Sequence, residues 1–254
     1  MIYMNKKCLK LLMVSADYVN GLSLNNIILN PKIKKFKKIS VITSNPSSKI
    51  IIYRKYINYY KINTLNEKTL IKKTKELLNI LKPDAVVTGI NGPKHNIDEA
   101  IINLSVELNI RTYSIQNFWG DVNLNYKNTA KTIFVLDKFA ADRTKKIVPT
   151  NTNIRIVGSI NHENYYKIKL NKIKQKKNGE KVKLFFCSQP FLEKSGFDKI
   201  LIEFLLCIKK FNYEIFFRPH PANSKSFTNK IYNQCKHLNI NLKIDKNNNI
   251  EKML

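Results

Sequence analysis

The sequence predicts an α/β protein made of two doubly wound units with parallel sheets, the second of them truncated. Short apolar strands alternate with amphipathic helices along the chain, a pattern typical of parallel sheets with right-handed crossovers. A charged, Gly-bearing stretch without periodicity interrupts this pattern at residues 167–181. The alternation resumes at residue 182 and continues only to residue 254, which is less than the usual length of a domain.

The first unit, residues 1–166, carries most of the predicted elements. Nearly continuous apolar runs are typical of strands at the centre of a parallel sheet, and leucines at helical spacing predict amphipathic helices. We expect residues 16–21 to form a loop after the first strand. The predicted strands are 9–15, 39–43, 84–89, 111–115, 132–136 and 154–157, with shorter candidates at 50–53 and 59–62; the predicted helices are 22–29, 67–81, 97–108 and 138–147.

The second unit, residues 182–254, repeats the same order of elements after the linker at 167–181. The spacing predicts strands at 182–187, 214–217 and 240–244 and helices at 197–210 and 224–238. Residues 249–254 look like the first turn of another helix, because their apolar positions have helical spacing. We therefore expect a partial domain with the same alternation of strands and helices as the first unit.

The formal net charge of +27 raises the question of a polyanionic partner. Only five of the 45 basic residues are Arg, the usual residue for base edges and bidentate phosphate contacts, and the Lys residues are spread along the whole chain. This distribution does not favour nucleic acid, although a peripheral contact with an anionic membrane stays open. No apolar run reaches the length of a spanning helix. The four Cys residues are scattered, without metal-like spacing, which indicates a reducing compartment without disulfides. We expect a cytoplasmic protein, with the inner face of the membrane as the alternative.

A stiff turn, Arg218-Pro219-His220-Pro221, follows the predicted strand 214–217. Its two prolines prevent both a continued strand ladder and an immediate helix. Arg218 and His220 are thus held at the carboxyl end of a strand, where ligands bind in open α/β sheets. Arg suits phosphate or carboxylate, and His can donate to the same anion. The alternative is a rigid connection with a surface Arg.

Three stretches resemble GT-B glycosyltransferases, in particular the bacterial capsule and wall polymer enzymes of the sialyl-, polysialyl- and CDP-glycerol glycerophosphotransferase type. The turn at 218–221 is similar to the Arg-x-His-Pro or Lys-Pro-His-Pro turn of these enzymes. Residues 134–140 with 157–159 are similar to the end of a GT-B first domain, and residues 182–189 to the first strand and nucleotide-facing loop of a GT-B second domain. The resemblance implies two Rossmann-like units.

The resemblance implies a nucleotide sugar as donor substrate, bound mainly by the second unit in the cleft. Ser188 and Gln189 would line its phosphates, while Arg218 and His220 would neutralise the leaving phosphate. The sequence contains no Asp-x-Asp motif, so we expect neither a metal nor a cofactor beyond the donor itself.

The acceptor, a glycan or a lipid-linked sugar, would then be bound by loops of the first unit. The candidate catalytic residues are Asp17, His95 and Asp121, each near a predicted strand end, although each could instead be a helix cap or a solvated loop residue. Trp119 could stack on a sugar or simply pack. Gly158 and Ser159 would lie at the hinge.

By this resemblance the protein is expected to transfer a sugar from a nucleotide-activated donor to a cell-surface polysaccharide or a lipid-linked acceptor. GT-B second domains continue past this point with a Ser/Thr- and Glu-bearing loop, so we expect a fragment of a longer enzyme. Two alternatives stay open. One is a nucleotide-sugar 2-epimerase, which shares the architecture, and the other is an inactive remnant or a polyanion-binding protein.

Overall fold

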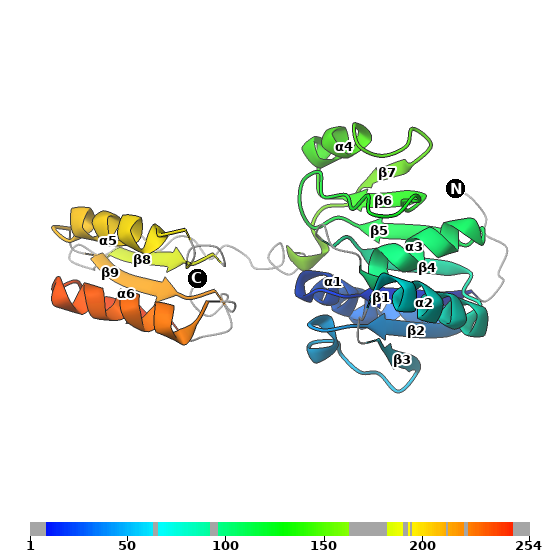
Figure 1. The fold of residues 1–254 in the computed structure, drawn as a ribbon, viewed down its shortest axis with the longest axis horizontal. Helices are drawn as coiled ribbons and strands as arrows, with labels where there is room; N and C mark the ends of the chain where they lie inside the picture. Colours follow the sequence, from blue (N-terminus) through cyan, green and yellow to red (C-terminus); the bar gives the residue numbers. More distant parts are fainter. Residues whose placement is uncertain are drawn as a thin grey trace. The chain divides into compact units, whose positions relative to one another are not determined.

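The computed structural model describes residues 9–62, 66–91, 96–162, 182–189, 193, 195–211, 213–220 and 223–245. Contacts divide the chain into two compact units, residues 1–169 and 170–254 (Figure 1). Among the described residues, no helix is long and apolar enough to span a membrane.

The first unit contains a seven-stranded sheet in the order β3-β2-β1-β4-β5-β6-β7, with every neighbouring pair parallel. The order reverses between β1 and β4, which makes their carboxyl ends the topological switch point where ligands bind in such sheets. The strands are β1 (Lys10–Ser15), β2 (Lys38–Thr43), β3 (Ile57–Lys61), β4 (Ala85–Gly89), β5 (Arg111–Ile115), β6 (Thr132–Val135) and β7 (Asn153–Ile156).

Helices cover both faces of this sheet, so its central strands are apolar on both sides. On β1, Leu11 and Met13 pack into the cluster that contains Leu24 of α1, whereas Leu12 and Val14 pack into the cluster on the opposite face. The helices are α1 (Tyr18–Leu29), α2 (Glu67–Leu81), α3 (Ile97–Glu107) and α4 (Lys138–Lys145), with short 3-10 turns η1 (Pro31–Lys35) and η2 (Ser47–Lys49).

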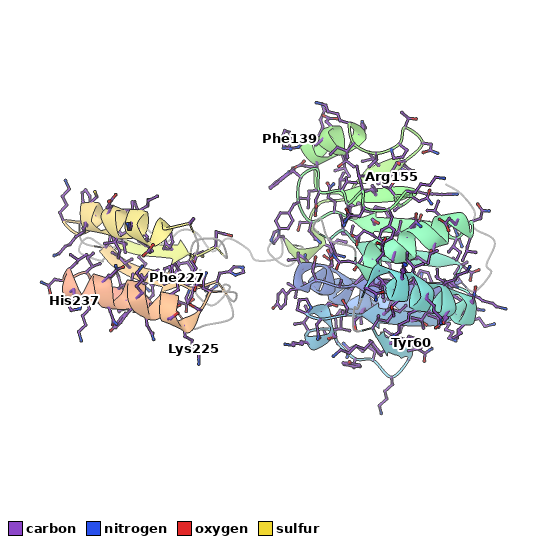
Figure 2. The ribbon with its side chains drawn as sticks, viewed as in Figure 1. Tyr60, Phe139, Arg155, Lys225, Phe227 and His237 are labelled. Carbon is purple, nitrogen blue, oxygen red and sulfur yellow. The ribbon has the colours of Figure 1, made fainter. Side chains whose placement is uncertain are left out.

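The second unit has a three-stranded parallel sheet in the order β10-β9-β8. Its elements are β8 (Val182–Cys187), α5 (Phe197–Ile208), β9 (Tyr213–Arg218), α6 (Lys225–His237) and β10 (Leu242–Ile244). Lys225 and His237 mark the two ends of α6 (Figure 2). The core of the second unit contains Leu205 of α5, Phe217 of β9 and Ile231 of α6, so both helices pack against the sheet.

The predicted α/β class with two parallel-sheet units is confirmed, and two local predictions are wrong. Residues 18–21 belong to α1 and not to a loop, because Asp17 caps the helix four residues earlier than expected. Residues 50–53 form no strand, since Ile50 ends η2 and β2 pairs instead with β3 at 57–61. The predicted turn at 249–254 lies outside the described residues.

Candidate active site

The start of α1 lies at the switch point of the first sheet. Asp17 follows β1 and caps the helix, because its Oδ1 accepts a hydrogen bond from the Asn20 N–H at 2.7 Å. Burial raises the pKa of Asp17 above its ordinary value, although backbone N–H groups of the capping turn partly oppose the shift. The cap therefore holds a carboxylate at the edge where a ligand is expected.

Asn20 is buried and joins three strand ends. Its Nδ2 lies 3.1 Å from Asp17 Oδ2, 3.1 Å from the Ile90 carbonyl and 3.0 Å from Asn91 Oδ1. Its Oδ1 accepts a hydrogen bond from Asn117 Nδ2 at 2.6 Å. Asp17 follows β1, Ile90 follows β4 and Asn117 follows β5, so one amide fixes the loops after three strands.

Gly89, the last residue of β4, leaves the space that Asn20 occupies. A methyl group at this position would lie 1.9 Å from Cγ of Asn20, so one of the two would have to move. We expect Gly89→Ala to lower the free energy of unfolding of the first unit by about 1–3 kcal/mol. Urea denaturation followed by fluorescence of Trp119, the one Trp in the chain, measures this. In an Asn20→Ala background the cost should largely vanish, and an equal cost there would contradict the explanation.

A cavity of about 430 Å³ opens at this edge of the first sheet. Two exposed aromatic side chains belong to it, Phe118 at 59% and Trp119 at 52% exposure. It is lined by Asp17, Val19, Asn20, Ile90, Asn117, Phe118, Trp119, Gly120 and Asp121. Its walls thus come from the loops after β1, β4 and β5 and include two aromatic rings and two carboxylates.

Trp119, which lines the cavity, is held by the residue that caps α4. Trp119 Nε1 donates to Asp137 Oδ2 at 2.7 Å, and Asp137 Oδ1 accepts from the Ala140 N–H at 2.7 Å as the cap of α4. The bond from Trp119 is the main reason that the pKa of Asp137 lies below its ordinary value. Gln116 Nε2 donates to the Asp121 carbonyl at 2.9 Å. The loop that carries both Trp119 and Asp121 is therefore held at two points.

Asp121 is the group in the cavity that is best suited to accept a proton near neutral pH. Burial, and then the negative charge of Asp17, raise its pKa to about 6. Asp17 instead uses both carboxylate oxygens to accept bonds from Asn20. The two acids thus differ in role, since Asp17 organises the site while Asp121 can exchange a proton with a ligand.

A second acidic pair lies buried at the start of α3, beside the residues that line the cavity. Asp98 is fully buried, and the Asn91 side chain and the Ala16 backbone N–H are near enough to its carboxylate to oppose part of the rise in its pKa. Burial, and then the charge of Glu99, raise the pKa of Asp98 well above its ordinary value. Glu99 Oε1 accepts a bond from the Asn91 N–H at 2.9 Å, while burial raises the pKa of Glu99 to about 7.

In the second unit, the ends of β8 and β9 meet through Asn223. Ser188 Oγ donates to Asn223 Oδ1 at 2.7 Å, and the His220 N–H donates to the same oxygen at 2.9 Å. Asn223 Nδ2 lies 3.3 Å from the Gln189 carbonyl. The structure therefore brings three of the four predicted donor residues together around one amide, and the fourth, Arg218, ends β9.

Arg218 is paired with an acid that follows β10. Its Nε lies 2.6 Å and its Nη2 2.5 Å from Asp245 Oδ2, and the Asp245 side chain is only 3% exposed. The guanidinium carbon also lies 5.0 Å from the ring centre of Phe185. This arrangement fixes the orientation of the guanidinium and balances much of its charge.

The predicted acceptor residues divide into three groups. Asp17, Asp121 and Trp119 lie together in the cavity of the first unit. Gly158 and Ser159 follow β7, where Gly158 has a φ of 80° and Ser159 accepts a bond from the His162 N–H at 3.1 Å. His95 lies outside the described residues.

Sequence reasoning missed Asn20, Asp98, Glu99, Asn223 and Asp245. Asp98 and Glu99 lie in a first helical turn, where acids are common, and Asn20, Asn223 and Asp245 are polar residues near the ends of elements, so the sequence carries no signal that separates these five from surface residues. Within the described ranges, no group of three or more His, Cys, Asp or Glu side chains is placed to hold a metal ion.

No protein-family model and no curated protein matches this sequence. Solved structures do match its fold. UDP-GlcNAc 2-epimerase from Methanocaldococcus jannaschii has a TM-score of 0.60 at 16% identity, covering 96% of this chain and 75% of that one. The epimerase from Neisseria meningitidis bound to UDP-GlcNAc has a TM-score of 0.60 at 13% identity, covering 95% and 73%.

A glycosyltransferase from Rickettsia africae also matches, with a TM-score of 0.59 at 14% identity over 93% of this chain and 68% of that one. Each match covers nearly all of this chain, so it includes strands and helices of both units. Similarity at these identities establishes the fold. The chain therefore has a GT-B-like α/β fold.

Proposed function

We propose that this protein is a glycosyltransferase that moves a sugar from a nucleotide-activated donor to a glycan or lipid-linked acceptor in cell-surface polysaccharide synthesis, on the cytoplasmic side of the membrane. The observation that carries the proposal is the cavity of the first unit, which gathers Asp17, Asp121 and the exposed ring of Trp119. An aromatic face beside carboxylates suits a sugar whose hydroxyl is to be deprotonated. A fold shared with a glycosyltransferase adds support.

In this proposal Asp121 is the general base. An acceptor hydroxyl gives its proton to the Asp121 carboxylate, and its oxygen forms a bond to the anomeric carbon of the donor. The bond between that carbon and the phosphate oxygen breaks, and the electron pair leaves with the nucleotide. A pKa of about 6 keeps Asp121 ionised at pH 7 while leaving it basic enough to take the proton.

The donor nucleotide is assigned to the second unit, at Ser188, Gln189, Arg218 and His220. Negative charge grows on the phosphate as the nucleotide leaves, and donors fixed in advance stabilise it. Arg218 is held in place by Asp245, and the turn around His220 is held by Asn223. No metal is needed for this charge stabilisation in the proposal.

Calorimetry with a panel of UDP-, CDP- and CMP-activated sugars tests the donor site. We expect His220→Ala to weaken binding about 10- to 100-fold, as for the loss of a hydrogen bond to a charged group. Arg218→Ala alone would remove the ion pair of the buried Asp245, so the matched variant is Arg218→Ala with Asp245→Ala. Unchanged affinity in both the His220→Ala protein and the double variant would refute the donor-site assignment.

A 2-epimerase is the second candidate, because two of the structures with this fold are UDP-GlcNAc 2-epimerases. An epimerase changes the configuration of UDP-GlcNAc without any acceptor, whereas a transferase releases the nucleotide only when an acceptor is present. Binding to generic polyanions with a steep salt dependence, and no binding of nucleotide sugars, would instead favour the non-enzymatic alternative.

A further inference from the structure

The cavity of the first unit is acidic in a strongly basic protein. The chain has a formal net charge of +27. Of the residues that line the cavity, the charged ones are Asp17 and Asp121, and the others are neutral. The sign of the charge inside the cavity is thus opposite to that of the chain as a whole.

The surroundings of the cavity add to this acidity. Asp137 accepts the bond from Trp119 Nε1 and so places a third carboxylate beside the Trp119 ring. Arg143 of α4 packs against Gly120, since a Cβ on Gly120 would lie 3.1 Å from its Nε, and its guanidinium carbon lies 5.6 Å from the ring centre of Phe139. Arg143 is not among the residues that line the cavity, so the charged side chains of the lining are both acidic.

Neutral residues make up the remainder of the cavity wall: two amides, two aromatic rings, two aliphatic side chains and one glycine. Asn117 Nδ2 already donates to Asn20 Oδ1 at 2.6 Å, so these two amides fix the shape of the cavity wall. Trp119 is pinned by its bond to Asp137, which leaves its ring as a fixed flat face. Such a face packs on the C–H side of a sugar ring, while carboxylates accept hydrogen bonds from its hydroxyl groups.

We propose that this cavity takes an acceptor sugar that carries no negative charge, and that it rejects acidic sugars by repulsion from Asp17 and Asp121. The inference rests on the proposed function, because it names the class of acceptor for the same cavity. A carboxylate or phosphate of the ligand within a few ångströms of two acids would weaken binding at least about tenfold, even with the screening that is typical near a protein surface.

Fluorescence of Trp119 reports on this cavity, because it is the one Trp in the chain. Methyl glucoside and methyl galactoside are titrated at pH 7.5 against the matching methyl uronides, which differ by a carboxylate in place of the CH₂OH group. Saturation-transfer NMR on the same samples checks binding independently. We expect at least one neutral glycoside to bind at least tenfold more tightly than its uronide. Asp121→Asn should reduce the difference in affinity between the neutral glycoside and its uronide. Asp142 is an exposed acid on α4, so Asp142→Asn should leave this difference unchanged.

A uronide that binds as tightly as its neutral partner would overturn the inference while leaving a sugar-binding cavity in place. Absence of binding by every sugar, in both measurements, would overturn the inference together with the acceptor half of the proposed function. Calorimetry of nucleotide-sugar binding to the whole chain reports separately on the donor half, which is assigned to the second unit. Failure of the inference can therefore be told apart from failure of the proposed function.

Discussion

Replacing Asp121 by Asn is expected to lower the rate of sugar transfer about 10²- to 10⁴-fold, the usual contribution of a general base. Asparagine keeps the size and polarity of the side chain but cannot take the acceptor proton. Affinity for the nucleotide sugar should not change, because the donor residues lie in the other unit. The rate is measured as nucleotide release in the presence of acceptor, beside Asp142→Asn as the control.

The same assignment predicts the direction of the pH dependence. The base works only when it is ionised, so the transfer rate should rise with pH through the pKa of Asp121, about 6, and then level off. At pH 5 roughly one molecule in ten would be active, which follows from one pH unit below the pKa. A normal rate in the Asp121→Asn protein, or a rate that falls between pH 5 and 7, would contradict the role of Asp121.

Raising the pH from 5 to 8 is expected to destabilise the first unit, and Glu99→Gln is expected to reduce this loss, while the part that comes from the raised pKa of Asp98 stays. The folded pKa of Glu99, about 7, lies above its ordinary value of 4.5. The folded state therefore binds the proton more tightly than the unfolded chain, so its stability falls as pH rises from about 4.5 through about 7. The shift corresponds to about 3 kcal/mol.

Glutamine at position 99 can still accept the bond from the Asn91 N–H, so the variant isolates the charge. Glu107→Gln is the matched control, because Glu107 lies on the same helix, is exposed and accepts a bond from Asn103 Nδ2 at 3.1 Å. Urea denaturation followed by Trp119 fluorescence gives the free energy of unfolding of each variant at pH 5, 6, 7 and 8. Equal pH slopes in the wild type and Glu99→Gln would contradict the account of this buried pair.

Sequence pattern predicts the elements of both units well where the periodicity is strong. Residues 67–81, 111–115 and 182–187 form α2, β5 and β8 at the expected bounds. Parallel strands end at one edge of a sheet, so the loops with Asp17, Trp119 and Asp121 could be expected near one another. The cavity contains all three.

The parts that sequence does not predict depend on contacts between distant residues. Asn20 reaches the loops after β4 and β5, and Asp245 reaches Arg218 across 27 positions of sequence. The raised pKa of Asp98 follows from its burial in the folded unit, and burial of one helical turn cannot be derived from its own residues. These contacts decide which acids are structural and which can react.

The most direct test of the central claim is a product assay with the wild-type chain, a panel of UDP-, CDP- and CMP-activated sugars and a neutral glycan acceptor. Nucleotide release and the mass of the glycan are followed with and without the acceptor. The proposed function predicts nucleotide release that requires the acceptor, together with one added sugar on the glycan. Conversion of the nucleotide sugar to its epimer without acceptor, or no consumption of any donor, would contradict it.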